Sequence, residues 1–121
     1  MISPTLRAVV IGGSLKEGSL PAAFASMEDR RYPSRLGEQT EIEIIELTVP
    51  TQQVAAMALE LSAALKPRFF YAHLLDKQRM LVVFPRTVVE IPRGDAGAVS
   101  HASSVGSLFR IPVEQMRFAE M

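Results

Sequence analysis

Tyr71 and His73 are the residues of this sequence best suited to work together at one site. They stand two positions apart in an apolar run, and side chains two apart in a β-strand lie on the same face of the sheet. An imidazole can accept or donate a proton near neutral pH, and a phenol beside it can donate a hydrogen bond. With Arg79 or Glu90 from neighbouring strands the pair would form a polar pocket, so these four are candidate ligand-binding residues. A half-buried structural Tyr–His pair is the alternative reading.

The other chemistry-bearing residues form no recognisable catalytic pattern. His101 stands among serines on a predicted helix, where nothing resembles the Gly-x-Ser-x-Gly turn of a serine nucleophile. Gly12 to Ser19 follows a predicted strand but lacks both the Gly-x-Gly-x-x-Gly spacing and the Gly-Lys-Ser/Thr ending of a phosphate-binding loop. With no cysteine and two histidines, the sequence predicts no metal site and implies no cofactor, and no catalytic residue is assigned.

The stretch from Phe69 to Arg93 would position Tyr71 and His73. Three apolar runs rich in Val, Phe and Ile, separated by short polar or proline-containing breaks, predict an antiparallel meander over residues 69–75, 79–84 and 87–91. Alternation along these runs puts apolar side chains on both faces of the meander. A helix, a second subunit or a ligand must therefore cover each face.

Hydrophobic spacing predicts the elements around this meander. A compact apolar run predicts a strand at residues 6–11, and an alternating pattern predicts another at 41–47. A spacing of three and four predicts helices at 19–29, 51–65 and 95–109. Asp95 is a predicted N-cap. The arginine-rich segment 30–39 has the composition of a loop, whose arginines would pair with nearby acids. Residues 113–115 predict one helical turn, and residues 116–118 predict a short closing strand.

Together these elements predict an α+β fold in a single domain of residues 1–121. From Ile42 onward the order is strand, helix, strand, strand, helix, strand, which is the ferredoxin-like order βαββαβ, with an extra strand at the N-terminus. The sheet would be antiparallel or mixed, because a crossover helix places the Ile42 and Phe70 strands parallel. The helices are expected mainly on one face, and either the Phe24 segment or a second subunit would cover the other.

The end of the chain, from Gly106 to Phe118, resembles the ending of small uncharacterised prokaryotic proteins that carry an apolar β-meander. Their tail follows the pattern Gly-x-x-x-Gly-Ile-Pro-x-x-Gln-x-x-Phe. This chain keeps the first Gly, the Ile-Pro pair, the Gln and the Phe, and Arg110 stands at the place of the second Gly. The resemblance covers at most the last half of the chain. It implies a meander followed by a helix and implies no activity.

Composition limits the classes of partner. Lys+Arg and Asp+Glu both number 13, so the basic excess typical of nucleic-acid binding is missing. No apolar run reaches the roughly 20 residues that span a bilayer, and the N-terminus lacks the pattern of a signal peptide. We therefore expect a cytoplasmic protein that binds neither nucleic acid nor membrane.

Three classes of function remain open at this point. The apolar faces of the meander favour a non-catalytic module that binds a small ligand or a partner and acts as a homodimer through a sheet face. The first alternative is a small enzyme with its site around Tyr71 and His73. The second is a structural subunit of a larger complex.

Overall fold

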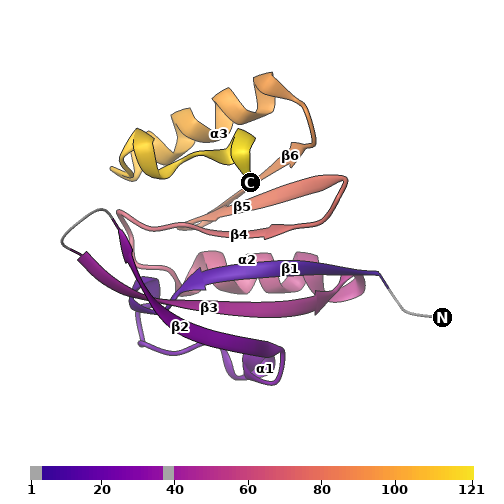
Figure 1. The fold of residues 1–121 in the computed structure, drawn as a ribbon, viewed down its shortest axis with the longest axis vertical. Coiled ribbons are helices and arrows are strands. Elements are labelled where there is room, and N and C mark those ends of the chain that lie inside the picture. Colours follow the sequence, from indigo (N-terminus) through magenta and orange to yellow (C-terminus); the bar gives the residue numbers. More distant parts are fainter. Residues whose placement is uncertain (1–3, 37–39) are drawn as a thin grey trace.

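The computed structural model describes residues 4–36 and 40–121 as an α+β fold built on one six-stranded sheet (Figure 1). Neighbouring strands are antiparallel throughout, in the spatial order β2-β3-β1-β4-β5-β6. The strands are β1 (Thr5–Ile11), β2 (Glu28–Leu36), β3 (Thr40–Pro50), β4 (Ala72–Leu75), β5 (Arg79–Phe84) and β6 (Thr87–Pro92). The predicted α+β class and antiparallel sheet are confirmed.

Three α-helices and four 3-10 turns accompany the sheet in the described residues: α1 (Ala22–Ala25), α2 (Val54–Ala64), α3 (Ala96–Leu108), η1 (Gly12–Ser14), η2 (Thr51–Gln53), η3 (Val113–Gln115) and η4 (Phe118–Glu120). The two longer helices confirm their predictions. Asp95 caps α3, because its Oδ1 accepts a hydrogen bond from the Ala98 backbone N–H at 2.9 Å. α1 is a single turn within the longer helix predicted over residues 19–29.

β4, β5 and β6 form the predicted meander, with consecutive strands paired as neighbours. β1 lies between β3 and β4 and is antiparallel to both. β3 and β4 therefore run in the same direction, as the crossover through α2 predicts, but the N-terminal strand separates them. The long crossover lets the chain step over β1 and leave it at the centre of the sheet.

The two longer helices cover opposite faces of the sheet, which corrects the expectation that helices lie mainly on one face. Leu81 and Val83 of β5 point to the face that α2 covers, which we call the α2 side. Met80, Val82 and Phe84 point to the other face, where α3 and the C-terminal tail bury them, and which we call the α3 side. A meander that is apolar on both faces needs a cover on each, and the chain supplies both (Figure 1).

Phe24 does not cover the second face. Its side chain is buried on the α2 side, where Met27 and Leu20 pack beside it. The α3 side is closed instead by the C-terminal third of the chain, with Ala102, Ile111, Met116 and Phe118 in its core.

The segment predicted as a loop at residues 30–39 is mostly strand, because residues 28–36 form β2 and pair with β3; residues 37–39 lie outside the described residues. β2 is the edge of the sheet, where a strand carries charges and where Pro33 needs no partner for its missing N–H. Arg31 pairs with the nearby Glu28, as predicted, and it also reaches across to Glu43 of β3 at 2.9 Å. The charged, proline-containing composition of this segment is therefore that of an edge strand, which sequence alone does not distinguish from a loop.

The predicted closing strand at residues 116–118 does not form, and η3 and η4 occupy the tail instead. η3 confirms the single turn predicted at residues 113–115. Met116 and Phe118 are nevertheless buried, because they pack against the α3 side of the meander. Without that strand, and with β1 at the centre of the sheet, the ferredoxin-like order is not confirmed.

Candidate functional site

The α3 side of the sheet is covered over one half only. Over β4, β5 and β6 the side chains are closed in by α3 and the tail. Over β1, β3 and β2, which we call the open face, four aliphatic side chains remain half-buried: Val9, Ile11, Ile42 and Ile44. The boundary between the two halves falls at β4, which contains His73 and begins directly after Tyr71.

A cavity of about 200 Å³ occupies this boundary, and we call it the His73 cavity. Its aliphatic wall comes from β1 and β3, its aromatic wall from the segment that leads into β4, and its polar groups from β2, β4 and the tail. The lining residues are Val9, Ile11, Ser34, Arg35, Ile42, Ile44, Phe69, Phe70, Tyr71, His73 and Gln115. Tyr71 and His73, singled out by sequence, therefore share one cavity.

Tyr71 anchors the aromatic wall to the tail. Its hydroxyl donates a hydrogen bond to the backbone carbonyl of Gln115 at 2.6 Å, and its ring meets Phe118 edge-on with 5.3 Å between centroids. Burial raises the pKa of Tyr71 to about 12, so its phenol stays neutral at physiological pH. The phenol therefore holds the wall in place rather than transferring a proton.

His73 lies beside Tyr71, with 6.2 Å between the ring centroids. Burial, with a smaller contribution from the positive charge of Arg7, lowers the pKa of His73 from 6.5 to about 4. Among the described residues no group forms a hydrogen bond with the imidazole. Every fully buried polar side-chain atom of these residues has a hydrogen-bond partner. The imidazole nitrogens are therefore not fully buried, and they remain accessible from the cavity. The result is a neutral imidazole that can offer one donor and one acceptor to a ligand.

Arg79 and Glu90 do not join this site. The pairing of β5 with β6 places both on the α2 side with Leu81, so the sheet separates them from Tyr71 and His73. They pair with each other instead, at 3.1 Å. Neither Arg79 nor Glu90 therefore orients the imidazole as a catalytic base, and an imidazole with so low a pKa is a weak base.

Phe69 stands at the mouth of the His73 cavity in an unusual backbone conformation. Its φ is +75°, and its side chain is 51% exposed. A bulky residue in the left-handed region costs about 1–3 kcal/mol. The backbone is held there by a hydrogen bond from the Phe69 N–H to the carbonyl of Phe109 at 2.8 Å.

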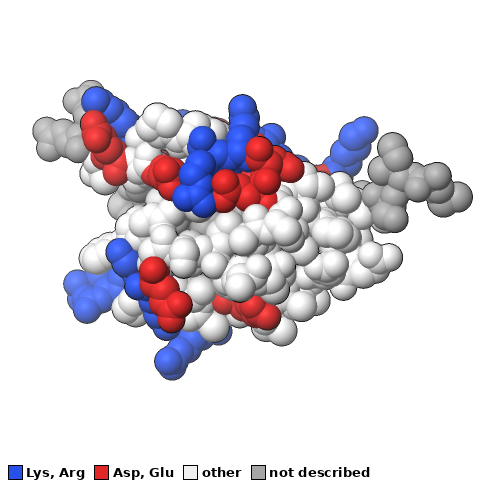
Figure 2. Space-filling model, turned by 90° about the horizontal axis from the view of Figure 1, so that it is seen from below, with Lys and Arg blue, Asp and Glu red and all other residues white. Residues whose placement is uncertain are grey.

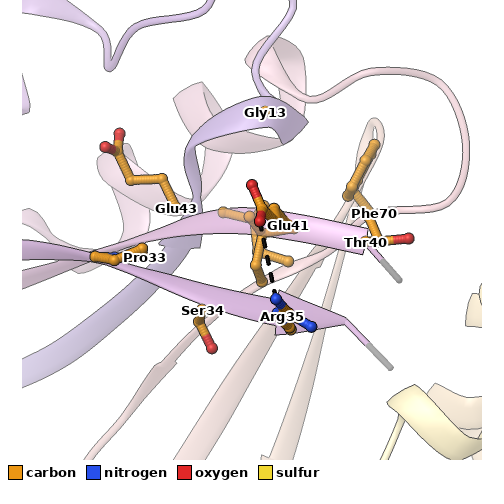
Figure 3. Close-up of a pocket in the computed structure, with 10 residues that line it drawn as sticks. Gly13, Pro33, Ser34, Arg35, Thr40, Glu41, Glu43 and Phe70 are labelled. Carbon is orange, nitrogen blue, oxygen red and sulfur yellow. Dashed lines mark ion pairs between the residues drawn. The ribbon is translucent and has the colours of Figure 1, made fainter. Parts of the chain in front are cut away.

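A larger, shallower hollow of about 590 Å³ adjoins the His73 cavity at the end of the β2–β3 hairpin (Figure 3). The two share Ile11, Ser34, Arg35, Ile42 and Phe70. The hollow adds polar residues to this shared wall, and Arg35 and Glu41 face each other across the hairpin at 3.9 Å. The two hollows therefore lie side by side and share one wall.

The rest of the open face is polar and internally paired. Glu46 is only 5% exposed, and its carboxylate receives Arg7 on β1 and Arg30 on β2, the latter at 2.7 Å. A hydrogen bond from Tyr32 is the largest cause that lowers the pKa of Glu46, with the two arginines adding to it. Seen from the side of β2 and α1 (Figure 2), basic and acidic side chains lie in mixed groups beside a broad uncharged area.

Sequence reasoning missed the aliphatic wall, although β3 carries a signal for it. Its polar positions switch faces at the doublet Ile44-Ile45. Before the doublet, Glu41 and Glu43 occupy the α2 side and the isoleucines the open face, whereas after it Glu46 lies on the open face. A strand whose apolar side changes midway must find apolar surroundings on both faces of the sheet.

Other candidates remain apart from this site. His101 is exposed on α3. Among the described residues no cluster of three His, Asp or Glu could hold a metal ion. None of the helices in residues 4–36 and 40–121 is long and apolar enough to cross a membrane.

Comparison of the chain with protein-family models, with curated proteins and with solved structures gave no match. The function must therefore be argued from the His73 cavity itself.

Proposed function

We propose that this protein is a non-catalytic binding module whose site is the His73 cavity. The observation that carries the proposal is that Tyr71 and His73 line one cavity of about 200 Å³ with apolar walls and few polar groups. Ligand sites are typically apolar hollows with a small number of polar groups that fix orientation. An enzyme is the weaker candidate, because no side chain of the described residues hydrogen-bonds to the imidazole and because Arg79 and Glu90 occupy the opposite face.

A pair of matched variants tests this proposal. A thermal-shift screen against a metabolite library should find compounds that raise the melting temperature, because a ligand that binds only the native state stabilises it. Val9→Phe would fill the cavity, whereas Val88→Phe adds the same bulk at a half-buried position on β6, on the α2 side. We expect Val88→Phe to keep the stabilisation and Val9→Phe to lose it. Stabilisation that survives Val9→Phe, or a screen without any stabilising compound, would contradict the proposal.

We further propose that two copies associate through the open face. Its half-buried aliphatic row of Val9, Ile11, Ile42 and Ile44 supports this, because apolar patches rimmed by polar residues mark association surfaces. Two-fold dimers are the commonest soluble oligomers. Light scattering at tens of micromolar should give about twice the 13.3 kDa chain mass, and a strict monomer would contradict this part of the proposal. A cysteine-free composition supports a cytoplasmic setting, which we include in the proposal.

A further inference from the structure

Phe69 is the one strained residue for which the fold itself gives no reason. Three residues other than glycine have positive φ in the described chain: Phe69, Arg86 and Arg110. Arg86 is the second residue of the two-residue turn between β5 and β6, a position that favours positive φ after Pro85. Arg110 follows the end of α3, where helices commonly end in this conformation. Glycine or asparagine would serve the backbone better than Phe69 does.

Packing does not account for Phe69 either. Half of its side chain is exposed, and it belongs to neither of the two buried cores. The ring does line the His73 cavity, together with those of Phe70 and Tyr71. Contact between the Phe69 ring and a ligand would explain why a strained backbone carries an exposed ring at the mouth of the cavity.

The polar groups of the cavity favour a ligand without charge. Tyr71 is neutral and hydrogen-bonded to Gln115, and His73 is neutral and open to the cavity. Arg35 is the charged lining residue, and Glu41 pairs with it at 3.9 Å. Arg7, whose charge also acts on His73, is paired with Glu46. A charged ligand beside His73 would therefore lose its hydration and have to compete with these carboxylates for a counter-ion, whereas a neutral one with an N–H or C=O would pair with the imidazole.

The shape and size of the cavity favour a flat ring. An apolar cavity of about 150 Å³ holds benzene. The His73 cavity has about 200 Å³, with aromatic rings on one side and aliphatic side chains on the other. Rings pack on one another in stacked or edge-to-face geometry, which a planar ligand can adopt and a puckered one cannot.

We propose that the His73 cavity binds an uncharged, planar heteroaromatic compound of one or two rings, and that Phe69 closes over it. This inference rests on the proposed function and adds to it the chemical class of the ligand and the residue that selects it. His73 supplies the hydrogen bond that orients the ring.

Indole is a suitable probe, because it is flat, neutral and carries one N–H. Titrations of the full chain by calorimetry at pH 7 should show binding of indole, and weaker or no binding of indole-3-carboxylate and of the non-planar cyclohexylmethanol. Phe69→Gly should weaken indole binding by roughly tenfold, the loss expected for one good aromatic contact. Because glycine suits the backbone at this position, its melting temperature should not fall. Arg86→Gly changes a residue of the same backbone conformation away from the cavity and should leave indole binding unchanged.

Each other outcome overturns a defined part of the inference. Unchanged indole binding in Phe69→Gly would remove Phe69 as the closing residue, and a melting temperature lowered by several degrees would make its ring a structural element. Equal binding of the charged or non-planar probes would refute the ligand class. If indole fails to bind while a library compound binds and is lost in Val9→Phe, the proposed function stands and this inference falls. If nothing binds the cavity, both fall.

Discussion

The two halves of the α3 side of the sheet differ in how far the chain covers their apolar side chains. Over β4, β5 and β6 the chain closes its own core, and the buried Phe84 stacks on Phe109 with 5.8 Å between centroids. Over β1, β3 and β2 the chain leaves aliphatic side chains half-buried and pairs charges between neighbouring strands. The closed half holds the fold together, whereas we propose that the open half binds. The His73 cavity lies where the two halves meet.

The largest loss of stability is expected when an aromatic ring is removed from the closed half. Phe84→Ala takes away a fully buried side chain that meets Tyr71, Phe109 and Phe118, so we expect the free energy of unfolding to fall by about 3–5 kcal/mol. Phe69→Ala removes the same ring at the open mouth and should cost far less. Urea denaturation of both variants measures the contrast. Similar losses would mean that the two halves do not differ in this way.

The pH dependence of stability tests whether His73, at the boundary between the two halves, is buried as a neutral group. The folded imidazole stays neutral down to about pH 4, while the unfolded one takes up its proton near 6.5. Between these values the unfolded state binds more protons, so the free energy of unfolding falls as the pH is lowered from 6.5 to 4, by about 3 kcal/mol in total.

Urea denaturation at several pH values measures this dependence. His73→Gln should remove this part of the pH dependence, while His101→Gln, at an exposed position, should retain it. If His73→Gln keeps the same slope as the unmodified protein, His73 is not a buried neutral group.

Two glycines of α3 test how tightly the closed half is packed. A Cβ at Gly106 would lie 2.2 Å from the Met116 Sδ and 3.1 Å from the Phe84 ring, so Gly106→Ala should destabilise the protein by about 1–3 kcal/mol. Gly97→Ala meets nothing closer than 3.4 Å and should stabilise the helix by up to about 1 kcal/mol. Thermal melts of the two variants should shift in opposite directions. Melting temperatures that shift in the same direction would show that the tail does not pack tightly against α3.

The smallest effect is expected on the outer strands. Arg31 meets Glu43 at 2.9 Å, but both side chains are largely exposed, so water screens their attraction. Glu43→Gln should leave the urea midpoint unchanged within error. A clear loss would show that the ion pairs of the β2–β3 hairpin contribute measurably to stability.

Local patterns predicted much of the closed half. Alternation marked both apolar faces of the meander, and the spacing of Val54, Met57 and Leu61 marked the buried stripe of α2. The Tyr71 and His73 pair was found because alternation alone puts both on one face. Such patterns reveal which side chains share a face, and that was enough for these elements.

Long-range pairing defeated the same reasoning elsewhere. The charges and proline of β2 read as a loop, because only its place at the sheet edge makes them acceptable. Arg79 and Glu90 were grouped with His73 because the register that puts them on the α2 side cannot be read from one strand. The cavity walls come from residues over 100 positions apart, such as Val9 and Gln115, which only the folded sheet brings together.

The most direct test of the His73 cavity uses the fact that the chain has two histidines. The side-chain nitrogen signals of His73 and His101 can be followed by NMR while the compound that stabilises the protein most in the thermal-shift screen is added. His73 lies in the cavity and His101 is exposed on α3, so the second serves as an internal reference. We predict that the His73 signals move to saturation while those of His101 stay in place. Stationary His73 signals under saturating compound would contradict the assignment of the cavity as the binding site.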